Sequence, residues 1–164
     1  MTQVEHLGRD DVTERDLFMI ELDRIDDLPD DLQLPSRYFA CFLAWDASGV
    51  SHDVIGAVAQ KLVRQGAVYF CTWGSDCERV HDIIDEERVR VDPTGESVIM
   101  TTWHRDERLS EAMWFLLHCT SPDERYECPS TLAISVGSSQ WSAEIREALS
   151  DPRKFTADVL ASEK

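Results

Sequence analysis

The feature that most constrains the fold is a set of short segments that are apolar along nearly their whole length. They are residues 38–44, 67–72 and 131–136. A strand covered on both faces has this pattern, whereas a strand with one wet face alternates apolar and polar residues. Residues 53–65, between the first two segments, instead carry apolar side chains at helical spacing. This alternation predicts a mainly parallel sheet with helices on both faces.

The same alternation extends to both sides of these segments. Residues 97–102 form a further apolar run, and residues 16–23 suit a strand better than a helix. Helical stripes follow near residues 76–87, 109–117 and 141–149, and a final helix after Pro152 would turn Phe155, Val159 and Leu160 inward. The expected fold is therefore one α/β domain over residues 1–164. It would be three-layered and Rossmann-like or flavodoxin-like, with four to five strands, and residues 1–16 would be loosely ordered.

Local signals mark the helix ends. Ser51 can cap the helix that starts near residue 53, and Gly66 suits the left-handed position after it. Ser75 and Glu78 have the spacing of a capping box, but Asp76 is an alternative cap.

Three of the expected strands end in a tryptophan: Trp45, Trp73 and Trp103. In an open parallel sheet, ligands bind beyond the carboxyl ends of the strands, where the turns after each strand converge. Helix N-termini also point at this edge, and they favour anions. The candidate ligand-binding residues there are Trp45, Asp46, Trp73, Ser75, Asp76, Trp103, Arg105 and Ser138. The tryptophans suit structural closure of the sheet edge, and alternatively an aromatic wall for a planar ligand, a sugar or a peptide side chain.

Candidate catalytic residues lie in the same turns. His104 follows Trp103, and Asp106 could orient it as a general base. Cys77 begins a helix, whose dipole lowers a thiol pKa and favours a nucleophile. A Cys77–His104 pair is thus one hypothesis, and the alternative is that these side chains serve caps and turns.

Motifs for other chemistry are absent from the sequence. It contains no G-x-G-x-x-G or G-x-x-x-x-G-K-[ST] phosphate loop, no G-x-S-x-G elbow and no H-E-x-x-H zinc motif. We expect neither a cofactor nor a metal site.

The charge balance restricts the partners. Asp and Glu number 32 against 16 Lys and Arg, which gives a net charge of -16. Binding to nucleic acid or to an anionic membrane needs clustered cations, and the sequence has no such cluster. A basic protein partner fits this charge, and so does a simple solvated surface.

The cysteines indicate the compartment. There are five, with no C-x-x-C spacing, and two lie within expected strands as Cys41 and Cys71. This usage is typical of a reducing cytoplasm rather than a secreted disulfide scaffold. The polar first 16 residues do not form a signal peptide, and no apolar run reaches the length of a membrane span.

The stretch from Arg37 to Gly137 resembles an uncharacterised bacterial family described only as a domain of unknown function. The resemblance rests on the segments 37–41, 73–81, 100–104 and 111–115, about three-fifths of the chain with the residues between them. It implies a bacterial cytoplasmic α/β domain and carries no activity.

Two classes of function remain. The favoured one is a small acidic binding or interaction module, by analogy with immunity proteins and adaptors that hold a basic partner. The alternative is a small enzyme or ligand sensor that uses the strand carboxyl ends around Asp46, Asp76, Cys77 and His104. The sequence leaves the oligomeric state open.

Overall fold

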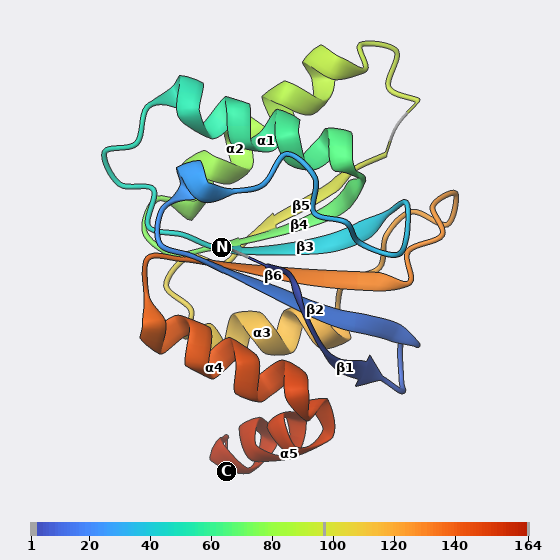
Figure 1. The fold of residues 1–164 in the computed structure, drawn as a ribbon, viewed down its shortest axis with the longest axis vertical. Helices are drawn as coiled ribbons and strands as arrows, with labels where there is room; N and C mark the ends of the chain where they lie inside the picture. The colour runs from blue at the N-terminus through green and yellow to red at the C-terminus, as the bar shows by residue number, and fades with distance from the viewer. Residues whose placement is uncertain (1–2, 97, 164) are drawn as a thin grey trace.

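A computed structural model describes residues 3–96 and 98–163 of the chain. The elements in chain order are the strands β1 (Glu5–Asp10) and β2 (Arg15–Leu22), the 3-10 helix η1 (Ile25–Asp27), β3 (Phe39–Ala44), α1 (His52–Gln65), β4 (Ala67–Trp73), α2 (Cys77–Val91), β5 (Met100–Trp103), α3 (Leu109–His118), β6 (Ser130–Val136), α4 (Ser139–Ser150) and α5 (Pro152–Ser162). They form an α/β structure with a six-stranded, mostly parallel sheet (Figure 1).

The sheet has the strand order β1-β2-β6-β3-β4-β5. Among the strands of the described residues, five are parallel and only β1 runs antiparallel, beside β2. The strands β3, β4 and β6 occupy the interior of the sheet, and nearly all of their residues are buried. Burial on both faces explains why these three strands lack the alternation of a half-exposed strand.

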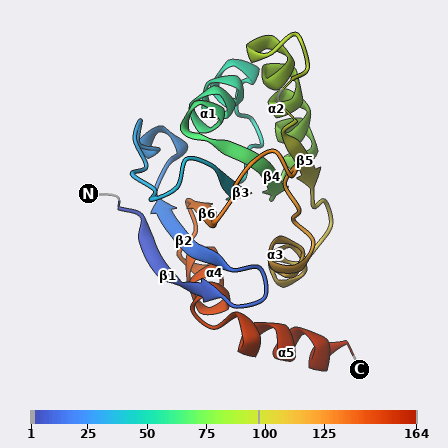
Figure 2. The same cartoon turned by 90° about the vertical axis from the view of Figure 1, so that its right-hand side faces the viewer.

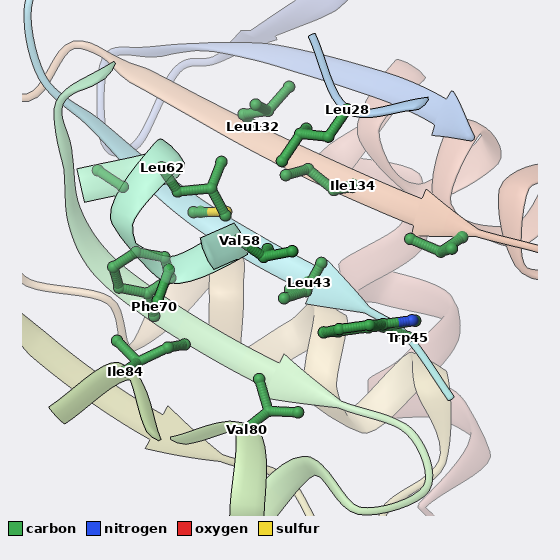
Figure 3. Close-up of a cluster of buried hydrophobic side chains, with 14 of the residues drawn as sticks. Leu28, Leu43, Trp45, Val58, Leu62, Phe70, Val80, Ile84, Leu132 and Ile134 are labelled. Atoms are coloured by element: carbon green, nitrogen blue, oxygen red, sulfur yellow. The ribbon is translucent and has the colours of Figure 1, made fainter. Parts of the chain in front are cut away.

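Helices cover both faces of the sheet. One face packs against α1 and α2, and the other against α3 and α4, with α5 beyond them (Figures 1 and 2). The first face buries Leu43, Leu62, Phe70 and Ile84 in one hydrophobic cluster (Figure 3). The second face buries Phe42, Met113 and other side chains of β3, β4, α3 and α4.

The predicted ends of α1 are confirmed. The Ser51 hydroxyl accepts a hydrogen bond from the Val54 amide at 3.2 Å. Gly66 adopts a left-handed φ of 110°, and its amide donates to the carbonyls of Leu62 and Val63. A Cβ at Gly66 would lie 1.9 Å from the Arg37 carbonyl oxygen, so only glycine fits there.

Two expectations about the sheet were wrong. The sheet has six strands rather than four to five, because residues 5–10 form β1 instead of a loose segment. As an edge strand, β1 has one ladder partner and a largely polar sequence, so it lacks the apolar pattern that marks the interior strands. Residues 1 and 2 lie outside the described residues. So does Ser97, the expected start of the strand that the structure begins at Met100.

The helix after Pro152 was expected to bury Phe155, Val159 and Leu160. In the structure α5 contains no fully buried residue, and Leu160 is about half-exposed. The apolar side chains of α5 meet the outer surfaces of other helices instead of the sheet, so its packing is shallow (Figure 2).

The connections leave the carboxyl ends of neighbouring strands in different directions. The chain runs from β3 to α1 and from β4 to α2 on one face, but from β6 to α4 and from β5 to α3 on the other (Figure 1). Adjacent strands whose connections diverge in this way leave a crevice at their carboxyl ends. Two such crevices arise here, one between β4 and β5 and one between β3 and β6.

Candidate functional site

Two cavities occupy the carboxyl edge of the sheet, and Trp141 lines both of them. The larger measures about 570 Å³ and lies beyond β4 and β5; we call it the acidic cavity. Its lining consists of Trp73, Gly74, Ser75, Asp76, Cys77, Glu78, His104, Arg105, Asp106, Glu107 and Trp141. The turns after β4 and β5 therefore converge as the sequence predicted, and with them seven of the eleven residues proposed from the sequence as ligand-binding or catalytic.

The smaller cavity measures about 490 Å³ and lies beyond the neighbouring strands β2, β6 and β3. Its lining consists of Asp23, Arg24, Ile25, Trp45, Asp46, Val136, Gly137, Ser138 and Trp141. The Asp46 carboxylate accepts hydrogen bonds from the hydroxyl and the amide of Ser48, and these bonds lower the Asp46 pKa. Ser138 caps α4 by accepting from the Trp141 amide at 3.2 Å. Both side chains therefore stabilise their own turns.

The three strand-end tryptophans separate in space. Trp45 is 4 % exposed and packs in the cluster beneath α1 and α2, near Leu43 and Val80 (Figure 3). Trp103 is 46 % exposed and packs at a tilt against His81 of α2, with ring centroids 4.5 Å apart. Only Trp73 lines the acidic cavity. The three rings consequently do not form one aromatic wall.

An aromatic wall does exist, but it pairs Trp73 with a residue of α4. The rings of Trp73 and Trp141 meet edge to face, with centroids 5.0 Å apart. The Trp73 indole N–H donates to the Glu107 carbonyl oxygen at 2.9 Å, which fixes the orientation of the ring. The helical stripe expected at residues 141–149 includes Trp141 and suits a packing role for it. Its place in the first turn after the Gly137–Ser139 turn was the available signal that it reaches the carboxyl edge.

His104 is held in place by two side chains. Its Nδ1 lies 2.8 Å from a carboxylate oxygen of Glu107, and its Nε2 lies 3.0 Å from the Thr102 hydroxyl. Its ring packs on Phe115, and the side chain is 4 % exposed. The predicted carboxylate partner was Asp106, and the structure places Glu107 in that position instead.

Asp106 turns away because of its backbone. It adopts a left-handed φ of 60°, and its carboxylate lies 3.6 Å from Arg105 Nε. An aspartate tolerates this conformation better than most residues do. The reversal of direction at Asp106 brings the following residue, Glu107, back toward His104.

The thiol of Cys77 is not activated. Cys77 is the first residue of α2 and is buried, and burial raises its pKa, although backbone N–H groups of His104, Cys77 and Glu78 partly oppose this effect. Desolvation of the thiolate thus outweighs the helix N-terminus, contrary to the predicted lowering. Both nitrogens of His104 are also engaged elsewhere, so the hypothesised Cys77–His104 pair does not form.

The start of α2 is tied to the neighbouring loop by one arginine. Asp76 occupies the N-cap position with a φ of 69°, but its carboxylate contacts Arg79 at 2.8 Å instead of capping the helix. The same guanidinium donates to the carbonyls of Ala47 and Val50 at 2.9 and 2.7 Å. Asp76 thus holds the N-cap position without a capping hydrogen bond from its side chain, and Ser75 is exposed beside it and makes no capping box.

The charges of the acidic cavity favour a cation. Four carboxylates line it, from Asp76, Glu78, Asp106 and Glu107, against a single arginine, Arg105. Arg105 bridges the mouth, because its guanidinium lies 3.4 Å from Glu78 and 3.6 Å from Asp106. The N-terminus of α3 already receives the Glu111 carboxylate on the Arg108 amide at 2.8 Å. The anion-binding tendency of helix ends is therefore opposed here.

Residues 3–96 and 98–163 contain neither a metal-binding cluster nor a membrane-spanning helix. No group of three or more His, Cys, Asp or Glu side chains there could hold a metal ion. None of the helices in this part of the chain combines the length and the apolar composition that crossing a bilayer requires. All five cysteines are free.

The sequence model of one family, described as a domain of unknown function (DUF7684), matches residues 17–152. The chain belongs to this family. The match confirms the predicted resemblance to a domain of unknown function and includes every residue that lines the two cavities. It leaves out β1 and all of α5 after Pro152. No curated protein matches the sequence.

Proposed function

We propose that the chain is a binding module that receives a positively charged side chain of a protein partner in the acidic cavity. The observation that supports this most strongly is the lining: four carboxylates and a paired aromatic wall surround about 570 Å³, with Arg105 as the one arginine among them. Charges that converge on a concave site raise the local concentration of counter-ions. The net charge of -16 adds a long-range attraction for a basic partner.

Arg105 indicates which cation suits the cavity. Its own guanidinium already bridges Glu78 and Asp106 at the mouth. A guanidinium from a partner would find the same carboxylates, together with the faces of Trp73 and Trp141, and an indole face attracts a guanidinium. Arg105 is exposed on a loop and competes for the same carboxylates, so the guanidinium of a partner would have to displace it.

The alternative, a small enzyme or ligand sensor, has less support. An enzyme would need an activated nucleophile or a base that can reach substrate. Burial raises the Cys77 pKa, and His104 is buried with both nitrogens engaged. A sensor that uses the same cavity without chemistry would share the cation preference proposed here.

The proposal also includes the cellular location and the class of protein expected from the sequence. A bacterial cytoplasmic protein of the immunity or adaptor kind suits the free cysteines and the acidic surface.

We classify the single domain as a Rossmann-like three-layer variant. Counted in chain order, its five parallel strands run 1-5-2-3-4, which differs from the flavodoxin order. Nucleic acid is excluded from the proposal, because phosphates would meet a strongly negative surface.

A titration with a short Gly/Ser peptide that carries one central arginine tests the function. Its matched control is the same peptide with citrulline, which keeps the shape and removes the charge. Binding is followed by the indole N–H signals of Trp73 and Trp141 in NMR spectra. We expect the arginine peptide to shift these signals and to bind at least about tenfold more tightly than the citrulline peptide, as charge-assisted contacts imply.

Three variants assign the binding to the cavity. Glu78→Gln with Asp106→Asn should weaken it by about tenfold, while Glu124→Gln with Glu127→Gln, which removes the same charge elsewhere, should change it little. Arg105→Gln should tighten it by removing the resident guanidinium. Equal binding of the arginine and citrulline peptides, or an equal loss in both double variants, would show that the cavity does not select a cation.

A further inference from the structure

The helix α5 forms a second concave surface on the molecule. It lies across α3 and α4 on their side away from the sheet (Figures 1 and 2). A groove of about 550 Å³ separates the three helices, and we call it the helical groove. Its lining consists of Leu109, Ser110, Met113, Glu144, Glu147, Ala148, Ser150, Asp151, Lys154, Phe155, Asp158, Val159 and Ser162. It shares no lining residue with the acidic cavity.

The floor of the groove is apolar. Leu109, Met113 and Ala148 are buried beneath it, and Phe155 and Val159 of α5 are only half-buried. These two α5 side chains pack on one side and leave apolar surface open on the other. The family match ends at the first residue of α5, so the helix that completes the groove lies outside the part of the chain that defines the family.

The rim of the groove is acidic and its charges are uncompensated. Glu144, Glu147 and Asp158 line it, and within the described part of the chain none of these carboxylates has a cation within 4.0 Å. Lys154 is the one cation in the lining. Asp151 is engaged as the N-cap of α5, where it accepts from the Lys154 amide at 3.2 Å.

From this combination we infer that the helical groove binds a basic amphipathic helix of a partner protein. An apolar floor with a charged rim is the surface into which an amphipathic helix lays its apolar face. Leucine-type anchors at positions i, i+3, i+4 and i+7 would cover Phe155 and Val159, and flanking Lys or Arg would meet Glu144, Glu147 and Asp158. The inference goes beyond the proposed function, because it concerns another surface and another kind of ligand.

Charge complementarity favours this occupant over a second copy of the chain. A two-fold dimer places the same patch of both copies against each other. Here it would bring two acidic rims together, which like-charge repulsion opposes. A partner helix with a basic polar face instead neutralises the rim.

Fluorescence anisotropy with a labelled Leu/Lys peptide of about 18 residues, with leucines on one helical face, tests the inference. A scrambled peptide of the same composition and a Leu/Glu peptide of the same pattern serve as ligand controls. At low salt we expect the amphipathic basic peptide to bind, the scrambled peptide to bind at least about tenfold more weakly, and the acidic peptide not to bind.

Two triple variants then locate the site. Glu144→Gln, Glu147→Gln and Asp158→Asn neutralise the rim, and we expect about tenfold weaker binding. Glu96→Gln, Glu124→Gln and Glu127→Gln remove the same charge away from the groove and should leave the affinity within about twofold. Far-UV circular dichroism checks that both proteins keep their helices. The acidic-cavity variant with Glu78→Gln and Asp106→Asn should bind the helix normally, so failure of one proposal is distinguishable from failure of the other.

Three results would overturn the inference: equal binding of the patterned and scrambled peptides, equal losses in the two triple variants, or absence of binding at low salt. Sedimentation provides a further test. A dimer that becomes tighter in the rim variant would assign the groove to a second copy of the chain, whereas a monomer in both proteins supports a partner helix.

Discussion

Gly74 is the residue on which the geometry of the acidic cavity most depends. It has a φ of 114°, and a Cβ built on it would lie 2.3 Å from the Trp45 carbonyl oxygen, so the turns after β3 and β4 touch through it. Gly74→Ala should lower the free energy of unfolding by more than about 2 kcal/mol, from strain and clash together. Gly49→Ala, with a φ of 75° but no atom within 4 Å, should cost only about 1 kcal/mol. Urea denaturation measures both, and equal losses would mean that the contact with Trp45 is unimportant.

Cys77 provides a second test at the residue scale. Burial raises the pKa of Cys77 and shields its thiol, so its reactivity at pH 8 should be low and should increase only as the pH rises further, whereas Cys119 is exposed to reagents. We expect iodoacetamide to label Cys77 at least about tenfold more slowly than Cys119, as followed by mass spectrometry of peptides. The urea-unfolded chain, in which all five thiols are exposed, is the control. Labelling of Cys77 as fast as Cys119 in the folded protein would restore the nucleophile hypothesis.

His104 shows where residue-level prediction ended. The sequence predicted Asp106 as the carboxylate that orients this histidine, whereas the structure places Glu107 there. The sequence could not show that Asp106 takes a left-handed backbone, which turns its own side chain away and brings Glu107 in. The sign of φ at a non-glycine residue depends on tertiary contacts, so the local sequence seldom predicts it.

At the scale of elements, the buried strands and α1 were predictable because their signals are local. Ser51, Gly66 and the apolar stripe between them mark α1 by hydrogen bonding and burial alone. The strand β1 was missed because its stability comes from partners far along the chain. It pairs with β2, and Glu5 forms a bidentate ion pair with Arg146 of α4 at 2.9 and 3.2 Å.

This ion pair leads to a prediction about β1. The hydrogen bond from Arg146 lowers the Glu5 pKa. The clamp is therefore complete above the unfolded pKa of about 4.3 and is lost as the pH falls through the lower folded value. Glu5→Gln should speed amide hydrogen exchange in residues 5–10 at pH 7 and leave β4 unchanged. Glu144→Gln, on the same helix as Arg146, should have no such effect. Unchanged exchange in β1 would show that the strand is held by its ladder alone.

At the scale of the whole molecule, the strand order could not be predicted from the sequence. β6 inserts between β2 and β3, although it is the last strand in the chain. Local patterns specify that a strand is buried, but not which neighbour buries it. This insertion carries α4, and with it Trp141, to the carboxyl edge, where it separates the two cavities. The sequence therefore predicted that the candidate site lies at the carboxyl edge of the sheet. The division of this edge into two cavities and the formation of its aromatic wall depend on the strand order.

The net charge of -16 leads to a prediction for the whole molecule. Excess charge of one sign destabilises a compact state through self-repulsion, and salt screens it. Raising NaCl from about 0.02 M to about 0.5 M shortens the Debye length from roughly 20 Å to roughly 4 Å. We expect the Tm to rise by at least about 3 °C, the shift that about 1 kcal/mol gives in a chain of this length.

The triple variant with Glu96→Gln, Glu124→Gln and Glu127→Gln should respond less to salt, because it starts with less repulsion. Calorimetric scans of both proteins at the two salt concentrations make this comparison. Ion pairs such as Glu5–Arg146 act in the opposite direction, because salt weakens them. A Tm that stays constant or falls with salt would mean that such pairs outweigh the repulsion. The ion pairs would then offset the destabilising effect of the excess acidic charge on the folded state.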